Sequence, residues 1–587
     1  MYTDYLPASN YSSALRNLPQ HRIFRFSMRA SHKFKRFWWA GAIFPLLFLC
    51  LGLLFLPLAG IQADEVFFAT AIFHLPLATV FGVRILGRQI PLMLLSYLGA
   101  LKSWVYFPIL DRIRPSYLTV RLPALLIGCV TVWLFIRLLK KLHGQKVAWV
   151  GGALLATDTM FLLTTCYDWG PVALQHLLSL AGIAFLVEFA RGGRRSRLFW
   201  AFFWFGLAFW DKALFAWVFS GLMVATIVIF PRELWSRSSP KNLGLAAAGL
   251  LIGALPLVAY NFASNFTTWR SNSRFEIAQF PSRWNALRIT WDGQILFDYL
   301  AHAPWAPGVM RVPDSRLFDL SEEIHHLAGF RLHYYNALEP GFLLALALLP
   351  LLWRTRARRV MLFCLIAMAV AWLQMAFTKD AGLGAHHVVL LWPLPHWFMA
   401  VAFVEASEWR PAVLKNAWKH AGAIALAALV ALLAVDNLLL TNEYYYQLAA
   451  YGANKSWDDA IFRLSEEAGH IQAPELAIYD WGIINQLVVL HRNRLPLYIA
   501  DPGFLAPWTD DKARLYFRKR LAEDVWIGHT PPFQQLDDIN GQLVRVARSN
   551  GFEKHMIETL ADRNGRAVFE IFRFVPLGGG LASPASR

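Results

Sequence analysis

The chain contains few cysteines and few charged residues for its length. Only four of its 587 residues are cysteine, and Cys50, Cys129 and Cys364 lie inside apolar runs, where a thiol behaves as a small hydrophobic group. This usage predicts no disulfide framework. Charged residues make up 16% of the chain and hydrophobic residues 57%, in too many separate runs for one water-soluble core. The composition therefore predicts a membrane protein and excludes a soluble globular one.

Several motifs that mark familiar chemistry are also missing. The chain has no Walker loop, no His-Glu-x-x-His pattern and no Cys-x-x-Cys pair, which argues against ATP-driven transport, zinc proteolysis and redox chemistry. It has no internal repeat and no glycine-rich fingerprint of a nucleotide-binding fold. The chemistry that stays open uses carboxylates and cations.

Positive charge, in contrast, is in excess, with 56 Lys and Arg against 39 Asp and Glu. The basic residues fall in short clusters between apolar runs and not on one extended face, so they do not indicate nucleic-acid binding. Such clusters are typical of cytoplasmic loops. With the N-terminus inside, alternation of sides places every cluster in the cytoplasm: residues 137–141, 191–197, 232–241, 354–359 and 410–419.

The apolar runs predict an α-helical polytopic membrane protein with about 11 transmembrane helices. The first run is long enough to cross a bilayer and follows a polar, basic segment, so we expect an uncleaved signal anchor. The spans are expected at about 38–60, 116–136, 147–165, 171–190, 198–210, 213–230, 243–261, 338–353, 360–377, 386–406 and 421–440.

Three regions follow from these spans. They are a cytoplasmic segment 1–37, a transmembrane domain 38–440 with outer loops 62–115 and 262–337, and an extracytoplasmic α/β domain 441–587. In the last region strands are predicted at 475–480, 495–499 and 524–528, helices at 482–490, 511–522 and 533–549, and a hairpin of 553–560 with 567–574. It can serve as a lid, as a docking site for an acceptor, or only as a stabilising element.

Two acids, Asp64 and Glu65, directly follow the first apolar run. The positive-inside rule places both on the outer face. A carboxylate at the lipid boundary can act as a general base, so Asp64 is the candidate catalytic residue and Glu65 a candidate substrate-binding residue. Acids at a helix end can also do no more than mark the membrane interface.

Short motifs follow one another over residues 62–215. After the acid pair come Arg88-Gln-Ile-Pro-Leu92, Leu95-Ser-Tyr-Leu98, Arg121-Leu-Pro123, Ala153-Leu-Leu-Ala-Thr157, a second acid at Asp168, and Gly206-Leu-Ala with Lys212 shortly after. In this order they resemble the family 39 glycosyltransferases of the GT-C class. That family includes protein O-mannosyltransferases and the aminoarabinose transferases of lipid A. By architecture the resemblance covers about the first 440 residues.

The resemblance implies an enzyme that moves a sugar from a polyprenyl phosphate carrier to a hydroxyl acceptor on the outer face, with inversion. The acceptor can be a lipid, a protein or a glycan. A hydroxyl nucleophile needs a base, which is the role expected of Asp64. The departing phosphate gains negative charge and needs cations nearby. The candidates are Arg88, Lys102, Lys212, Arg331 and Lys379.

Each candidate also has an ordinary alternative. Arg88, beside the position of a basic residue in the family pattern, binds the phosphate or reaches to a lipid headgroup. Lys212 contacts the phosphate or pairs with Asp211 next to it. Asp168 matches the second acid of the family and binds sugar or acceptor, or it only marks a helix start.

His386 and His387 begin a predicted span on the outer face, where the family pattern differs from this chain. Adjacent histidines on a helix point about 100° apart, which disfavours a shared metal. We expect them to hydrogen-bond phosphate or sugar, with interfacial packing as the alternative. A divalent cation at Asp64, Glu65 and Asp168 is a second option, but the supply of Lys and Arg favours a site without metal or other cofactor.

A secondary transporter or lipid flippase is the alternative from another class. Such a protein should have inverted halves and ionisable groups at mid-span, whereas this chain concentrates its acids at outer span ends. We therefore expect a multi-pass glycosyltransferase of a bacterial inner membrane, with a cytoplasmic N-terminus and a periplasmic or extracellular C-terminal domain. The sugar and the acceptor stay open, because two family motifs differ here.

Overall fold

In the computed structural model of the protein, the described residues are 41–73, 79–303, 308–328, 334–379, 381–409, 417–500 and 511–578. The expected cytoplasmic segment 1–37 and the candidate Arg331 lie outside these ranges. Contacts divide the chain into residues 1–43 and 44–587. Ile43, the first residue of the first helix, belongs to the first unit, and every other residue of the helices and strands described below belongs to the second.

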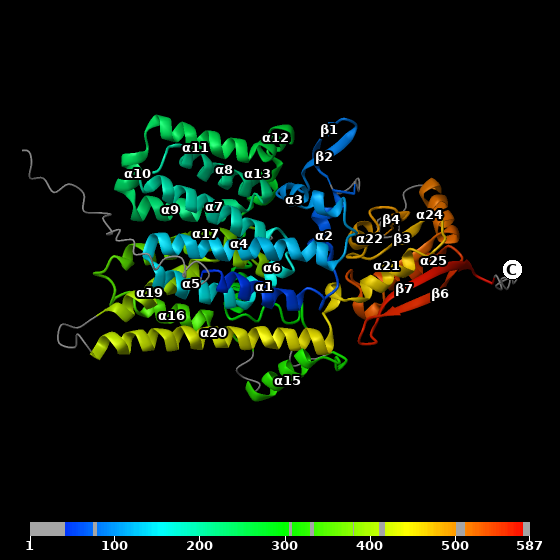
Figure 1. Ribbon diagram of the computed structural model, residues 1–587. Helices are drawn as coiled ribbons and strands as arrows, with labels where there is room; N and C mark the ends of the chain where they lie inside the picture. Colours follow the sequence, from blue (N-terminus) through cyan, green and yellow to red (C-terminus); the bar gives the residue numbers. More distant parts are fainter. Residues whose placement is uncertain are drawn as a thin grey trace, which may run out of the picture. The chain divides into compact units, whose positions relative to one another are not determined.

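The larger part of the chain is a bundle of apolar helices (Figure 1). Among the described residues, four helices are long and apolar enough to cross a membrane, and up to eight spans result if each bent pair counts as one. The long ones are α4 (Tyr117–His143), α7 (Val172–Ala190), α17 (Ala357–Phe377) and α20 (Ala417–Tyr451). The bent pairs are α5 (Gln145–Thr157) with α6 (Thr159–Cys166), α9 (Phe215–Ile229) with α10 (Pro231–Arg237), α11 (Pro240–Gly253) with α12 (Leu255–Ala263), and α18 (Ala385–Val388) and η4 (Val389–Leu391) with α19 (Leu394–Glu408).

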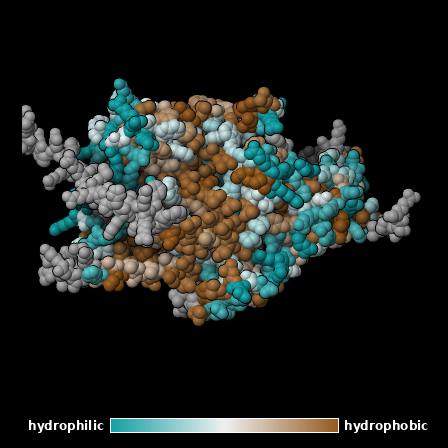
Figure 2. Space-filling model, viewed as in Figure 1, coloured by the Kyte–Doolittle hydropathy of each residue, from teal (hydrophilic) through white to brown (hydrophobic). Residues whose placement is uncertain are grey.

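Three shorter helices complete the bundle: α1 (Ile43–Phe55), α8 (Ser196–Asp211) and α16 (Leu338–Ala347). Each predicted span thus coincides with one helix or one bent pair, although the number that crosses a membrane stays a prediction. On the face seen in Figure 2, apolar residues form a broad band over the helices of the bundle. On α4, for example, Leu126, Val130 and Trp133 share one face and are all exposed. Such a face is stable in lipid and not in water, so the protein is a multi-pass membrane protein.

Shorter elements lie between the spans. Near the start of the chain, α2 (Ala63–Thr70) follows α1, and a hairpin of β1 (Phe81–Ile85) and β2 (Arg88–Met93) leads to α3 (Leu101–Leu110). The second predicted outer loop contains α13 (Thr267–Asn272), α14 (Phe280–Trp291) and α15 (Arg316–Ala328). The link between β2 and α3 contains Tyr97, and the link between α14 and α15 contains Tyr299; the charge of Asp64 acts on both.

The C-terminal residues form a five-stranded sheet with the order β4-β3-β5-β7-β6. β3 pairs in parallel with β4 and with β5. β7 pairs antiparallel with β5 and with β6. The strands are β3 (Leu476–Ile478), β4 (Leu497–Ile499), β5 (Val525–His529), β6 (Phe552–Ala561) and β7 (Ala567–Pro576), with helices α21 (Ala460–Ala468), α22 (Ile484–Leu490), α24 (Asp511–Glu523) and α25 (Ile539–Ser549). The predicted strands and hairpin coincide with this sheet. The helix predicted at 533–549 is shorter, because a 3-10 turn at η6 (Pro531–Phe533) precedes α25.

The expected domain boundary at residue 440 falls within a continuous helix. α20 runs from Ala417 to Tyr451, past the change in composition at Asn442. The helix continues because its last turns are buried against the second outer loop, where the rings of Tyr444 and Phe297 stack with centroids 4.1 Å apart. The polar composition after Asn442 therefore marks the end of the apolar surface and not the end of the helix.

The turn between β6 and β7 attaches the sheet to the helical bundle. Asn564 Nδ2 donates to the carbonyl oxygens of Val309 (2.7 Å) and Ala450 (2.8 Å). Arg563 Nη2 donates to the carbonyl of Leu58, 3.0 Å away, at the end of α1. This one turn thus bonds to the end of the first apolar helix and to the end of α20, so the C-terminal sheet is held next to the segment that carries Asp64.

Candidate active site around Asp64

Asp64 lies in the first turn of α2, and local bonds determine its position. Gln62 caps this helix, and its Oε1 accepts hydrogen bonds from the backbone N–H of Asp64 (2.6 Å) and of Glu65 (3.1 Å). The Asp64 side chain is exposed. Burial by the surrounding protein nevertheless raises the pKa of its carboxyl, while Gln62 and the charge of Lys212 act in the opposite direction. A carboxylate with a raised pKa that solvent can reach is suited to accept a proton.

Glu65 points away from Asp64 and is bound by protein groups. It is 1% exposed, and its carboxylate forms a bidentate pair with Arg121, with Nε–Oε1 2.7 Å and Nη2–Oε2 3.0 Å. Its Oε2 also accepts from the backbone N–H of Gln62 at 3.2 Å. Both oxygens of Glu65 are therefore engaged, which corrects the expectation that this acid is open to substrate.

Asp168 and Lys102 form a second buried ion pair. Lys102 Nζ lies 2.8 Å from Asp168 Oδ2, and the two side chains are 6% and 4% exposed. The other oxygen, Oδ1, accepts from the backbone N–H groups of Val172 (2.8 Å) and Ala173 (3.0 Å) at the start of α7. Asp168 therefore does mark a helix start, as the alternative interpretation expected. Its pairing with Lys102 joins α3 to α7 and neutralises both charges.

Lys212 differs from Lys102 because its ammonium group has no ion partner. It lies in the link between α8 and α9, is 3% exposed, and forms no ion pair within the ranges that the structure describes. The expected pair with Asp211 is wrong, since Asp211 Oδ2 accepts from Gln175 Nε2 at 2.8 Å and no pair with Lys212 forms. Burial lowers the pKa of Lys212 to about 8, although the charges of Asp211, Asp168 and Asp64 oppose this shift.

A glycine next to Asp168 brings Lys212 and His386 together. Gly170 has a φ of 125°, which disfavours any side chain. A Cβ at this position would lie 3.6 Å from Lys212 Nζ and 3.8 Å from His386 Cδ2. The ammonium and the imidazole thus both lie on the side of Gly170 where a Cβ would stand, next to the Asp168 segment.

The two predicted histidines have different partners. His386 Nδ1 accepts from Trp169 Nε1 at 2.9 Å, which assigns the ring proton to Nε2. His387 Nδ1 accepts from the backbone N–H of Gly382 at 3.2 Å. Both Nδ1 atoms are thus occupied by N–H donors, as in neutral rings. The donor Nε2–H of His386 can then face phosphate or sugar.

Two predicted cations lie apart from this group. Arg88 is exposed at the tip of the β1–β2 hairpin, paired with Ile85 across a two-residue turn (Figure 1). Lys379 is exposed, and its backbone N–H donates to the carbonyl of Arg274 at 2.8 Å. Neither side chain contacts Asp64, Lys212 or His386 in the described parts of the chain. A role for them in phosphate binding stays a prediction.

Aromatic residues that the sequence did not single out surround the same group. They are Tyr97, Trp169, Tyr299 and Trp457. The backbone of Leu98, next to Tyr97, pairs with Lys212. Burial and the Asp64 charge both raise the pKa of the Tyr97 phenol and of the Tyr299 phenol, which places both near Asp64. The sequence held no signal for them, because the chain contains 18 Tyr and 25 Trp and only the fold selects these four.

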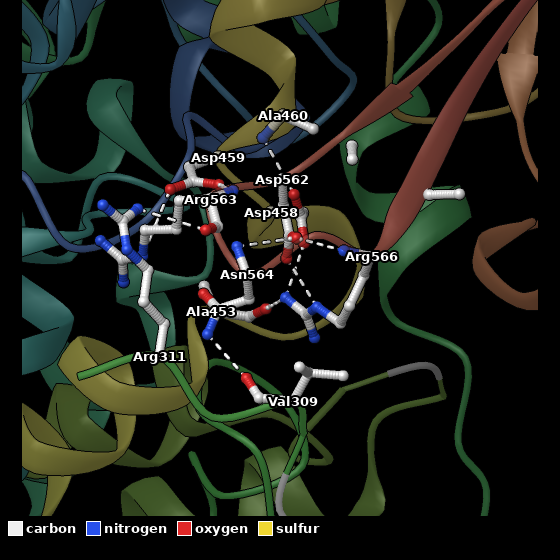
Figure 3. Close-up of polar contacts among 12 residues, drawn as sticks. Val309, Arg311, Ala453, Asp458, Asp459, Ala460, Asp562, Arg563, Asn564 and Arg566 are labelled. Atoms are coloured by element: carbon white, nitrogen blue, oxygen red, sulfur yellow. Dashed lines mark hydrogen bonds and ion pairs between the residues drawn. The ribbon is translucent and has the colours of Figure 1, made fainter. Parts of the chain in front are cut away.

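A cluster of acids close to the site has arginine partners. Asp458, Asp459 and Asp562 bring their carboxylates within 4.8 Å of one another, a spacing that can suit a metal ion. Figure 3 shows Arg566 between two of them: Nη2 is 2.8 Å from Asp458 Oδ2 and Nε is 2.6 Å from Asp562 Oδ2. Arg563 Nε lies 3.4 Å from Asp459 Oδ2. Guanidinium groups thus occupy the positions that a cation would take.

Comparison with known proteins agrees with this arrangement. The sequence model of the family described as dolichyl-phosphate-mannose-protein mannosyltransferase matches residues 112–260. The crystal structure of ArnT from Cupriavidus metallidurans bound to undecaprenyl phosphate is similar, with a TM-score of 0.54, 13% identity and coverage of 91% of this chain and 98% of that one. The apo structure of the same ArnT gives a TM-score of 0.52, 15% identity and coverage of 91% and 97%. No curated protein matches by sequence.

The family match contains Asp168 and Lys212, and the structural likeness covers 91% of the chain. The chain resembles the family 39 glycosyltransferases of the GT-C class, because the mannosyltransferase family model matches residues 112–260 and the fold is similar to that of ArnT. The glycosyltransferase interpretation of the sequence is therefore confirmed, and the transporter or flippase alternative is not favoured. Within this GT-C fold, Asp64 stands directly after the first apolar helix, where the sequence placed it.

Proposed function

We propose that the protein transfers a sugar from a polyprenyl phosphate carrier to a hydroxyl group of a lipid, protein or glycan at the outer membrane face. The support is the GT-C fold, together with an ionisable carboxylate and an unpaired ammonium at the same site. ArnT, which has this fold, binds undecaprenyl phosphate, and a carrier of that chemistry suits a site beside apolar helices.

The reaction needs one base and one cation. The hydroxyl oxygen of the acceptor attacks the anomeric carbon, and its proton passes to Asp64. The bond between the anomeric carbon and the phosphate oxygen breaks, and its electron pair stays on the phosphate. Attack from the face opposite the leaving group inverts the anomeric carbon. The phosphodiester thereby becomes a monoester with one more negative charge, which a fixed cation stabilises.

The burial of Lys212 without an ion partner among the described residues is the observation that supports this proposal most directly. Lys102 is neutralised by Asp168 and Arg121 by Glu65, whereas Lys212 is 3% exposed and has no ion partner among the described residues. A buried, unpaired ammonium is costly. A phosphate beside it offsets that cost, and the attraction is stronger than in bulk water because the side chain is largely shielded from solvent. We assign Lys212 to the departing phosphate and His386 Nε2 to the phosphate or the sugar.

No metal ion is required in this scheme. Of the three acids that a divalent cation would use, Glu65 is bound by Arg121 and Asp168 by Lys102, which leaves only Asp64. One free carboxylate is too few ligands for a Ca²⁺ or Mg²⁺ site made by protein groups alone. The positive charge at the phosphate then comes from Lys212.

The test compares wild type with Asp64→Asn and with Asp111→Asn, an exposed acid after α3. Purified protein receives undecaprenyl-phosphate mannose, aminoarabinose or galacturonic acid with a membrane extract as acceptor. The readout is released undecaprenyl phosphate. We expect release by wild type and Asp111→Asn, and a loss of about 100-fold to 10,000-fold in Asp64→Asn. Equal release by all three proteins would remove Asp64 from the mechanism.

A further inference from the structure

Tyr299 lies in a turn that other segments hold in place. It follows Asp298, which has a left-handed φ of 64°. The backbone N–H of Asp298 donates to the carbonyl of Ala301 (2.8 Å), and Asn454 Nδ2 donates to the carbonyl of Asp298 (2.6 Å). Because a left-handed non-glycine residue costs free energy, this turn needs such bonds, and they fix the direction of the next side chain.

The Tyr299 ring packs on two tryptophans from distant parts of the chain. Its centroid lies 5.4 Å from that of Trp169, before α7, and 6.1 Å from that of Trp457, after α20. The two indoles are themselves 5.6 Å apart at 81°. These are favourable distances and angles for aromatic pairs. The three rings, which we call the aromatic wall, form one unit.

Only one member of the aromatic wall is open to solvent. Trp169 is 4% exposed and Trp457 is fully buried, whereas Tyr299 is 39% exposed. Trp169 is also oriented by its hydrogen bond to His386. Two buried indoles thus support a tyrosine whose ring presents a fixed surface to solvent.

The aromatic wall lies next to the catalytic segment. The backbone N–H of Gly60 donates to the carbonyl of Trp457 at 2.7 Å, and Asp64 follows four residues later. Trp169 precedes Gly170, and Lys212 and His386 both lie beside Gly170. The exposed ring of Tyr299 thus packs on one residue bonded to the segment that leads to Asp64 and on another that adjoins the proposed phosphate site.

We propose that Tyr299, supported by Trp169 and Trp457, binds the face of the donor's sugar ring and so positions the anomeric carbon between Asp64 and Lys212. This inference rests on the proposed function and names a residue that determines sugar binding. A pyranose has C–H groups on its faces and hydroxyls on its rim. The electron-rich face of an aromatic ring attracts such C–H groups. The hydroxyls on the rim of the sugar then stay free to hydrogen-bond with His386.

The inference also gives the C-terminal region a defined contribution. Trp457 stands after the end of α20, in the segment where Asp458 is held by Arg566 of the C-terminal hairpin. The sheet thereby holds one of the two indoles that support Tyr299. A region whose role the sequence left open becomes part of the sugar site.

The experiment separates sugar binding from carrier binding. Wild type, Tyr299→Phe, Tyr299→Ala and the control Tyr335→Ala, an exposed tyrosine of the same loop, are purified in detergent. For each, dissociation constants are measured for undecaprenyl phosphate and for the undecaprenyl-phosphate sugar that wild type uses. We expect Tyr299→Ala to weaken sugar-donor binding about tenfold, with undecaprenyl phosphate binding unchanged. Tyr299→Phe and Tyr335→Ala should match wild type for both ligands.

Other outcomes overturn the inference. Equal binding of the sugar donor by Tyr299→Ala and wild type, or an equal loss for both ligands, would show that the ring does not contact sugar. Two results together would assign the tyrosine a structural role. They are weaker donor binding by both Tyr299→Ala and Tyr299→Phe, and a lower thermal midpoint for Tyr299→Ala than for Tyr299→Phe. If wild type binds neither ligand, the proposed function itself fails, which is a different result.

Discussion

Arg121 joins its guanidinium to the carboxylate of Glu65, 56 positions earlier in the chain, through two hydrogen bonds of 2.7 and 3.0 Å. The same guanidinium donates to the carbonyl oxygens of Leu56 (2.7 Å), Ala59 (2.8 Å) and Gly60 (2.6 Å). Arg121 therefore satisfies the unpaired carbonyls after α1 and holds α2 beside α4. Because Asp64 is the neighbour of Glu65 in the chain, this network of hydrogen bonds positions Asp64 before any substrate binds.

The Arg121–Glu65 pair should contribute strongly to stability. Arg121→Met leaves the carboxylate of Glu65 buried without a charged partner, which costs about 3–5 kcal/mol. The matched control is Lys141→Met, because Lys141 and Glu188 form an exposed pair worth at most about 1 kcal/mol. Thermal unfolding in detergent measures both. Equal midpoints for the two variants would contradict the structural role of Arg121.

The two buried lysines should respond in opposite ways to the same substitution. Lys212→Met removes an unpaired buried charge, so the protein should be at least as stable while turnover falls about 100-fold to 1000-fold. Lys102→Met leaves Asp168 buried without its cation, so the protein should lose about 3–5 kcal/mol. Thermal midpoints and undecaprenyl phosphate release distinguish them. A destabilised Lys212→Met protein would mean that Lys212 has a structural partner.

Turnover should depend on pH through two groups with opposite signs. Asp64 acts only when ionised, so kcat/KM rises as pH passes its pKa, which burial raises. Lys212 acts only when protonated, and burial lowers its pKa to about 8, so activity falls above about pH 8. Lys212→Arg should abolish this alkaline fall, because a guanidinium stays charged. A profile of the same shape in that variant would assign the alkaline limb to another group.

Gly60 should tolerate no side chain. A methyl group there would overlap the carbonyl oxygen of Asp458, so Gly60→Ala must move the first helix end away from the C-terminal segment. We expect a loss of about 1–3 kcal/mol and a fall in kcat. Gly244→Ala in α11 is the control, since nothing lies within 4 Å of its added Cβ. If both variants behave alike, the contact between Gly60 and Asp458 does not position Asp64.

Arg88 should matter less than Lys212. Its side chain is exposed at a hairpin tip, where a charge is well solvated and its loss has little effect on stability. Arg88→Gln should therefore change release of undecaprenyl phosphate by less than about threefold, in contrast to Lys212→Met. A loss as large as that of Lys212→Met would show that the hairpin closes over the phosphate, and would restore the contact predicted from the sequence.

Much of the architecture was determined by the sequence itself. Apolar runs placed the helices of the bundle, because a helix that faces lipid needs uninterrupted apolar residues. Alternating apolar residues and turn signals located the strands of the C-terminal sheet. The sequence also placed Asp64 after the first apolar helix, since position relative to a span is a local property, while its role as the base stays a prediction. The order of short motifs also indicated the glycosyltransferase family whose model matches residues 112–260.

Only the tertiary structure decided which charges are free. Glu65 and Asp64 are adjacent in sequence, yet one is bound by Arg121 and the other is open. Lys102 and Lys212 were equivalent as candidates, but only Lys102 meets Asp168. Tyr299, Trp169 and Trp457 come from three separate segments and carry no local signal. The physical reason is that an ion pair or a ring contact depends on distances between segments far apart in the chain, and folding alone sets those distances.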